Sequence, residues 1–153
     1  MKINPNIFRT YDIRGIYPDE LNEKTVSQIV AAFCSLYSKT KKIVLSRDSR
    51  LSSPPLHNMA AEVLRKAGKE VIDIGIAPDS LFYFSIFYYH FDGGIQISGS
   101  HNPKQYNGLT LHVRKPGEKI SRDIIGKDLE NIKERVLKKE NLSGSLPDKI
   151  GKV

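Results

Sequence analysis

The chain has 153 residues, 39% hydrophobic and 27% charged, which suits a single α/β domain and excludes a disordered or fibrous protein. Its 24 Lys and Arg outnumber its 17 Asp and Glu, but these basic residues are scattered and form no nucleic-acid-binding signature, so we expect no nucleic-acid partner. No apolar run is long enough for a bilayer and none opens the chain as a signal, and the single cysteine excludes an intrachain disulfide; we expect no membrane partner and a reducing, cytoplasmic location.

Amphipathic helices and short apolar strands alternate in the first half of the chain. Apolar residues at helical spacing predict a helix over 23–37, and Ile43–Leu45 is typical of a buried strand. A second helix is predicted to begin at 52–55, where Ser52 can cap it and the two prolines suit its first turn. We expect this helix to stop before Gly68, where a left-handed residue is favoured.

The second half continues the alternation. It predicts a strand over 70–74, a helix capped by Asp79 or Ser80 and reaching Tyr89, strands over 94–97 and 109–113, and a last helix from Ile125 to Val136. This order predicts an α/β fold: a three-layer α/β/α sandwich with a mixed, mostly parallel sheet of about four main strands. We expect residues 1–140 to form the domain and residues 141–153 to be a linker.

The loop that follows the predicted strand 94–97 carries the strongest chemical signal, Ser98-Gly99-Ser100-His101-Asn102-Pro103. The carboxyl end of a strand is where α/β proteins place ligands. Gly99 removes a side chain beside Ser100, which lets the backbone bend and a phosphate approach, and His101 can move a proton. A serine that starts phosphorylated donates a group and needs no activation. The plainer alternative is a polar loop with a capping serine.

The whole string resembles the phosphoserine loop of the α-D-phosphohexomutases, the family of phosphomannomutases and phosphoglucomutases, whose pattern is Thr/Ser-Ala/Gly-Ser-His-Asn-Pro. Two earlier segments, FRTYDIRG at 8–15 and RDSRLSSP at 47–54, are similar to family motifs in the same order. The Tyr-Asn-Gly that closes the loop, at 106–108, is similar to the phosphomannomutase/phosphoglucomutase branch, and its Asn-Gly predicts the return turn. The chain therefore resembles the first of the family's four domains.

The resemblance implies a mutase that moves phosphate between the 1- and 6-positions of a hexose phosphate through a hexose 1,6-bisphosphate, with Ser100 carrying the phosphate. The residues it assigns to catalysis are Ser100, His101 and Arg14. Those it places against the substrate are Tyr11, Asn102, Lys104, Thr110 and His112. Those expected to support the site are Arg9 and Asp12, through an ion pair, and Arg47, Asp48 and Arg50.

The same resemblance implies Mg²⁺ on the phosphate of Ser100, with further ligands from an Asp-Gly-Asp-x-Asp-Arg motif that this sequence lacks. The remaining mutase domains are therefore expected partners, and the isolated chain is expected to be inactive. The family also has a lysine where this chain has Thr110, and His112, on the same strand face, or Lys104 are its candidate replacements. A catalytically degenerate or stand-alone phosphosugar-binding relative remains the alternative.

Overall fold

One six-stranded sheet organises residues 3–138, the part of the chain that the computed structural model describes. The predicted linker, 141–153, lies outside the described residues. The elements follow the chain as η1 (Pro5–Ile7), β1 (Ile13–Ile16), α1 (Glu23–Leu36), β2 (Lys42–Arg47), α2 (Ser53–Lys66), β3 (Glu70–Ile76), α3 (Asp79–Tyr88), β4 (Gly93–Ile97), β5 (Tyr106–Val113), β6 (Arg122–Asp123) and α4 (Gly126–Leu137).

The strand order is β1-β5-β4-β2-β3, with β6 also paired to β5. Strand β2 runs parallel to β3 and β4, whereas β5 is antiparallel to β4, β1 and β6. Only β5 therefore runs against the other strands, which confirms the mixed, mostly parallel sheet. The predicted main strands are β2, β3, β4 and β5, and the short strands β1 and β6 extend the sheet beyond β5.

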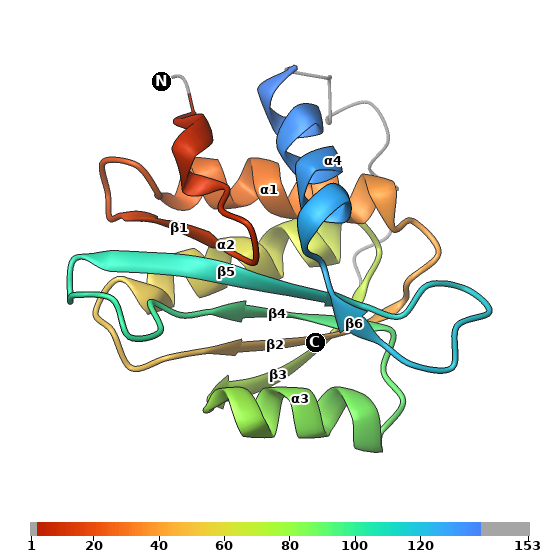
Figure 1. The fold of residues 1–153 in the computed structure, drawn as a ribbon. Coiled ribbons are helices and arrows are strands. Elements are labelled where there is room, and N and C mark those ends of the chain that lie inside the picture. Colours follow the sequence, from red (N-terminus) through yellow and green to blue (C-terminus); the bar gives the residue numbers. More distant parts are fainter. Residues whose placement is uncertain (1–2, 139–153) are drawn as a thin grey trace.

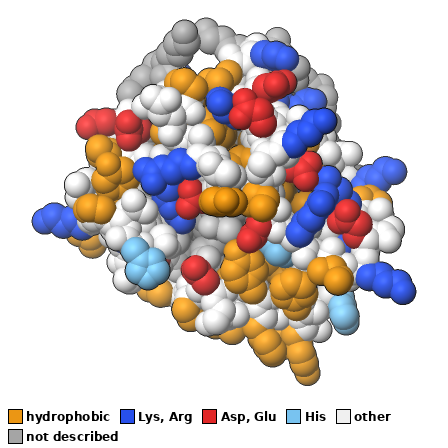
Figure 2. All heavy atoms as spheres, in the orientation of Figure 1, with side chains coloured by type: hydrophobic (Ala, Val, Ile, Leu, Met, Phe, Trp, Pro, Cys, Tyr) orange, Lys and Arg blue, Asp and Glu red, His pale blue; other side chains and the backbone are white. Residues whose placement is uncertain are grey.

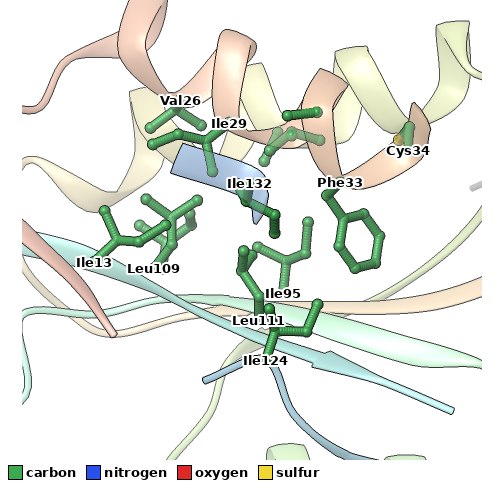
Figure 3. Packing of buried hydrophobic residues seen from close by; sticks show 14 of the residues in the cluster. Ile13, Val26, Ile29, Phe33, Cys34, Ile95, Leu109, Leu111, Ile124 and Ile132 are labelled. Atoms are coloured by element: carbon green, nitrogen blue, oxygen red, sulfur yellow. The ribbon is translucent and has the colours of Figure 1, made fainter. Parts of the chain in front are cut away.

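Helices cover both faces of the sheet, α1, α2 and α4 on one and α3 on the other (Figure 1). The larger core lies on the first face, where Ile95 and Leu111 of the sheet face Phe33 of α1 and Ile132 of α4 (Figure 3). Each such buried side chain contributes about 1.5–3 kcal/mol to folding. Cys34 belongs to this core, and burial raises the pKa of its thiol to about 12, so it is a packing residue.

Two predicted helix signals have different outcomes in the structure. Gly68 ends α2 in the left-handed conformation as expected, with φ +75°, and its N–H donates to the Arg65 carbonyl at 2.9 Å. Ser52 is the N-cap residue of α2, but its side chain does not cap the helix, and the N-cap of α3 is Pro78, not Asp79 or Ser80. The Ser52 hydroxyl is held instead by Asn107, far away in the sequence, and the cap predicted for α3 was wrong because that helix already includes Asp79 as its first residue.

The outer side of α3 is apolar and exposed. Figure 2 shows hydrophobic side chains gathered along the lower edge of the molecule, where α3 lies in Figure 1. The exposed residues are Leu81, Phe84, Phe87, Tyr88 and Tyr89. None of the helices in residues 3–138 has the length and apolar character needed to cross a membrane.

Candidate functional site

The polar loop connects β4 to β5 at the carboxyl end of β4, beside the connection from β2 to α2. Backbone bonds join these segments: the Ser98 N–H donates to the Gly108 carbonyl at 3.1 Å, and the Asp48 N–H donates to the Ile97 carbonyl at 2.9 Å. The loop turns back where the Tyr106 N–H reaches the Pro103 carbonyl at 3.0 Å. The return turn therefore precedes the Asn-Gly pair, which lies inside β5, and the predicted turn there was wrong.

Ser100 occupies the exposed tip of this loop. Its φ of +52° is in the left-handed region, which residues other than glycine seldom adopt and which costs about 1–3 kcal/mol. Its Oγ lies 3.3 Å from Nδ1 of His101, and its N–H donates to Oγ of Ser98 at 3.0 Å. Gly99 is not in the left-handed region, so the bend lies at the serine and not, as expected, at the glycine.

Arg50 joins the loop to the β2–α2 connection and uses every N–H of its guanidinium to do so. Its Nε donates to the Asp48 carboxylate, and its two Nη atoms donate to four carbonyl oxygens of the loop. These are the carbonyls of Pro103 and Asn102, both at 2.6 Å, and of Tyr106 and Ser100, both at 3.0 Å. The guanidinium lies against Gly99, where a Cβ atom would be 2.2 Å from Arg50 Cζ. The absent side chain of Gly99 thus makes room for Arg50.

Asp48, in the β2–α2 connection, binds both Arg50 and the start of the loop. Its carboxylate accepts the N–H of Gly99 at 2.9 Å, the N–H and Nε–H of Arg50 at 3.1 Å, and the hydroxyl of Ser53. Burial alone would raise the pKa of Asp48. The hydrogen bonds from Ser53, Gly99 and Arg50, together with the positive charge of Arg50, outweigh burial and hold that pKa below its ordinary value.

The lowered pKa of Asp48 predicts a loss of stability in acid. A carboxyl group whose pKa is lower in the folded protein contributes stability above its unfolded pKa of about 3.9, and this contribution is lost as the pH falls through the folded value. The thermal midpoint of Asp48→Asn should therefore lie below that of the wild type at pH 7, and the gap should narrow below about pH 4. Circular dichroism melts from pH 7 to pH 2.5 measure this, with the exposed Asp19→Asn as control. A gap that stays constant over this range would contradict the prediction.

Arg14 differs from Arg50 in how little of its guanidinium is occupied. It lies on β1, opposite Gly108, and is 5% exposed. Among residues 3–138 it makes one hydrogen bond, from Nη1 to the Ser98 carbonyl, while its Nε lies 3.1 Å from Asp12 without hydrogen-bond geometry. Burial, the largest influence, lowers its pKa. A buried cation beside Ser98 with unused donors is suited to an anion next to Ser100.

The expected ion pair between Arg9 and Asp12 was wrong. Asp12 pairs with Arg14, and Arg9 is an exposed residue whose backbone N–H donates to the Asp12 carbonyl at 2.9 Å. Asp12 lies in the bend just before β1, two residues from Arg14, and its carboxylate is 3.1 Å from Arg14 Nε. Asp12 thus supports the site through Arg14.

The remaining predicted residues near the loop occupy distinct places. The side-chain amide of Asn102 donates to the Gly99 carbonyl at 3.0 Å and so shapes the loop, and Tyr11 is 72% exposed. Lys104 is exposed and lines a surface groove of about 510 Å³. Arg47 donates to the carbonyl of Asp48 at 3.1 Å. None of these residues makes a hydrogen bond with the Ser100 hydroxyl within the described part of the chain.

The structure does not bring His112 to the loop. It pairs with Gly94, near the start of β4, which at about 3.4 Å per residue lies about 14 Å from Ser98. Its ring is buried, its Nδ1 lies 2.9 Å from Asp123, and its ring packs edge-on against Tyr83. His112 shares a strand face with Thr110 but serves the packing of α3 and β6, so it does not replace the family lysine.

Sequence reasoning missed two residues that shape the site, Asn107 and Ser53. Both are fully buried, and the Asn107 amide donates to the hydroxyls of Ser52 at 2.8 Å and Ser53 at 2.9 Å. Its side-chain oxygen accepts the N–H of Gly108 at 2.8 Å. A sequence signal for them does exist. The Tyr-Asn-Gly segment contains an asparagine and the RDSRLSSP segment contains a pair of serines, and both segments were assigned to the same site.

The described residues do not form a magnesium site by themselves. No group of three or more His, Cys, Asp or Glu side chains in residues 3–138 is arranged to hold a metal ion. Around Ser100, the Asp48 carboxylate is already occupied by hydrogen bonds and Asp12 is paired with Arg14. A phosphate on Ser100 would be the oxygen donor that this part of the chain adds.

The fold and the loop define the class of the protein as an α/β/α domain that presents a serine at the carboxyl end of a central strand. The family model described as phosphoglucomutase/phosphomannomutase, alpha/beta/alpha domain I, matches residues 5–141. The chain therefore belongs to the phosphoglucomutase/phosphomannomutase family, and its residues 5–141 match the family's first domain.

Individual relatives agree with this assignment. A phosphomannomutase of Salmonella montevideo is 41% identical over 131 residues, which are 86% of this chain and 28% of that protein. A phosphomannomutase of Klebsiella pneumoniae is 40% identical, with 83% of this chain and 80% of that sequence covered. A phosphoglucomutase/phosphomannomutase family structure from Burkholderia thailandensis superposes with a TM-score of 0.78 at 29% identity, over 98% of this chain and 32% of that one. This chain thus spans about a quarter to a third of several relatives.

Proposed function

We propose that this chain is the phosphoserine-bearing domain of a hexose phosphate mutase, and that Ser100 carries the phosphoryl group. The observation that carries the proposal is the exposed, left-handed Ser100, two residues from the Ser98 carbonyl that the buried and mostly unoccupied Arg14 binds. Phosphoserine adds about −1.5 to −2 of charge, which the free donors of Arg14 are placed to balance.

The proposed reaction moves one phosphoryl group in each direction. The bond between Ser100 Oγ and phosphorus breaks while a hydroxyl oxygen of the hexose phosphate bonds to phosphorus, and the proton of that hydroxyl passes to Ser100 Oγ, which becomes a free hydroxyl. The resulting hexose 1,6-bisphosphate returns its other phosphoryl group to Ser100, so the net change is isomerisation. Nδ1 of His101, 3.3 Å from Ser100 Oγ, is placed to hold or move a proton. Arg14 would stabilise charge on the phosphoryl oxygens.

The substrate class we propose is hexose phosphates, with mannose phosphates favoured by the names of the relatives. Mg²⁺, as Lewis acid on the phosphoserine, would take its other ligands from a further mutase domain, because the described residues do not complete a site. A phosphorylated sugar substrate and a buried, reduced Cys34 are both suited to the cytoplasm.

The remaining mutase domains are the proposed partners, since the matched Salmonella protein extends well beyond this domain. The apolar outer side of α3 supports this, because exposed aromatic surface on a domain is typical of a contact with further protein. We expect the chain alone to give negligible interconversion of mannose or glucose 1- and 6-phosphates. Robust turnover by this chain alone would contradict that expectation.

The second candidate function is a phosphosugar-binding relative that has lost turnover, and Thr110 is the observation that favours it. Incubation of the chain with glucose 1,6-bisphosphate or mannose 1,6-bisphosphate, followed by intact mass measurement, separates the two. A gain of about 80 Da that maps to Ser100 supports the mutase domain. Saturable binding without any gain in mass would support the binding protein.

Thr110 gives a prediction about activity. It is half-buried on β5, where it pairs with Gln96 of β4. It follows Gly108, the partner of Arg14, by two residues and therefore lies on the same face of the strand. Because threonine supplies a hydrogen bond but no positive charge, Thr110→Lys should speed the phosphorylation of Ser100 about tenfold or more. Time-resolved intact mass measures the rate. Thr110→Met, similar in length but uncharged, is the control, and an equal gain in both variants would contradict a charge effect.

A further inference from the structure

We propose that Arg50 is a positioning residue, which locks the 98–106 segment into the shape that presents Ser100 and does not bind the transferred phosphate. An arginine within a motif of a phosphoryl-transfer domain would ordinarily be assigned to phosphate binding. The family resemblance instead places Arg50 among the supporting residues, and its hydrogen bonds identify what it supports, the backbone of the loop. The inference deepens the proposed function, and only its phosphate-transfer test rests on that function.

The donor count of Arg50 leaves nothing for a phosphate. A guanidinium has five N–H groups, and those of Arg50 make five hydrogen bonds, one to Asp48 and four to loop carbonyls. Arg14 makes one hydrogen bond within the described residues. The two arginines of the site are thus divided between two tasks: Arg50 holds the backbone, and Arg14 keeps donors for an anion.

The loop needs such a fixed point because its shape is unfavourable by itself. Ser100 is left-handed, and its carbonyl converges with three others on one guanidinium. Strained backbone persists only where its surroundings over-determine it. Without Arg50, four carbonyls lose their shared partner, and Ser100 can relax to an ordinary φ that re-aims its hydroxyl.

Asp48 fixes Arg50 in turn. One carboxylate oxygen, Oδ2, accepts both Nε–H of Arg50 and the N–H of Gly99, so it joins the guanidinium to the start of the loop. The guanidinium rests on the bare Cα of Gly99, at a distance that leaves no room for a Cβ without displacement of Arg50. The hydrogen bonds of Arg50 and Asp48, here called the clamp, therefore hold the loop from Gly99 to Tyr106 against the β2–α2 connection.

The first test measures loop order without any phosphate. Endoproteinase Lys-C cuts after exposed lysines, and Lys104 lies inside the clamped segment. Under native conditions, the Arg50→Gln variant should be cut after Lys104 at least about tenfold faster than the wild type. The matched control is Arg47→Gln, which loses a single hydrogen bond to the Asp48 carbonyl and should be cut within about twofold of the wild-type rate. An unchanged rate at Lys104, or equal acceleration at lysines throughout the chain, would overturn the proposal.

The second test separates position from charge. Arg50→Lys keeps the positive charge but loses the planar fork, so phosphate uptake by Ser100 from glucose 1,6-bisphosphate should slow about 100-fold, as in Arg50→Gln. A wild-type rate in Arg50→Lys would mean that charge is what Arg50 supplies, and would overturn the proposal. If the wild-type chain takes up no phosphate while Arg50→Gln still loosens the loop, the proposed function fails and the positioning role stands.

Discussion

Ser100→Ala should abolish the gain of about 80 Da that hexose 1,6-bisphosphate gives the wild-type chain. The hydroxyl of Ser100 is exposed at the loop tip, and its only hydrogen-bond partner among the described residues is Nδ1 of His101. Its removal costs no packing, so the variant should fold and melt like the wild type. Without its hydroxyl this position has no oxygen to accept the phosphoryl group, and removal of a nucleophilic serine from a protease lowers kcat by a factor on the order of 10⁶, so the signal should fall below detection.

The matched control for this variant is Ser49→Ala. Ser49 is also exposed and lies in the neighbouring β2–α2 connection, but it makes no hydrogen bond that shapes the loop in residues 3–138. Its phosphate uptake should equal that of the wild type. Undiminished uptake by Ser100→Ala, with the phosphate mapped to another residue, would assign the reaction to that residue and refute the role of Ser100.

Gly108→Ala should cause the largest loss of stability among single substitutions around the loop. A Cβ at this position would lie 2.1 Å from Nη1 of Arg14 and 2.2 Å from the backbone oxygen of Ile13. The first contact pushes the guanidinium away from Ser98, and the second forces β1 away from β5, where backbone cannot yield cheaply. We expect the free energy of unfolding to fall by about 1–3 kcal/mol and the thermal midpoint by about 2–4 °C for each of these kcal/mol.

The same substitution should also slow phosphate uptake at Ser100, because Arg14 is displaced together with β1. Urea unfolding followed by circular dichroism measures the stability, and intact mass measures the uptake. Gly117→Asn is the control, since nothing lies within 4 Å of a Cβ there and the variant bears only the cost of its left-handed φ of +83°, a conformation that asparagine adopts more often than most residues. A Gly108→Ala chain as stable as this control would show that β1 and Arg14 adapt, contrary to the prediction.

Local patterns sufficed for most of the fold. The apolar spacing that predicted a helix over 23–37 matches α1 at Glu23–Leu36, and Gly68 ends α2 where a left-handed residue was expected. The strands with apolar residues were predicted as well. Strand β1, Ile13–Ile16, was harder to recognise, because it is four residues long and holds a buried arginine and a glycine. Its backbone pairing with β5 makes it a strand, although its own sequence has no clear strand pattern.

By itself, the sequence determined the alternating α/β architecture, the family resemblance and the loop around Ser100, because periodicity and motifs are local properties of the chain. The tertiary structure alone decided which groups the charged residues bind. Arg50 binds carbonyls 50 to 56 residues away, Arg14 keeps free donors, and His112 lies at the far end of its strand. Hydrogen-bond partners at such separations are set by strand order and register, which no local pattern contains. The loop expected from its serine and glycine is therefore held, in the folded protein, by an arginine from another motif.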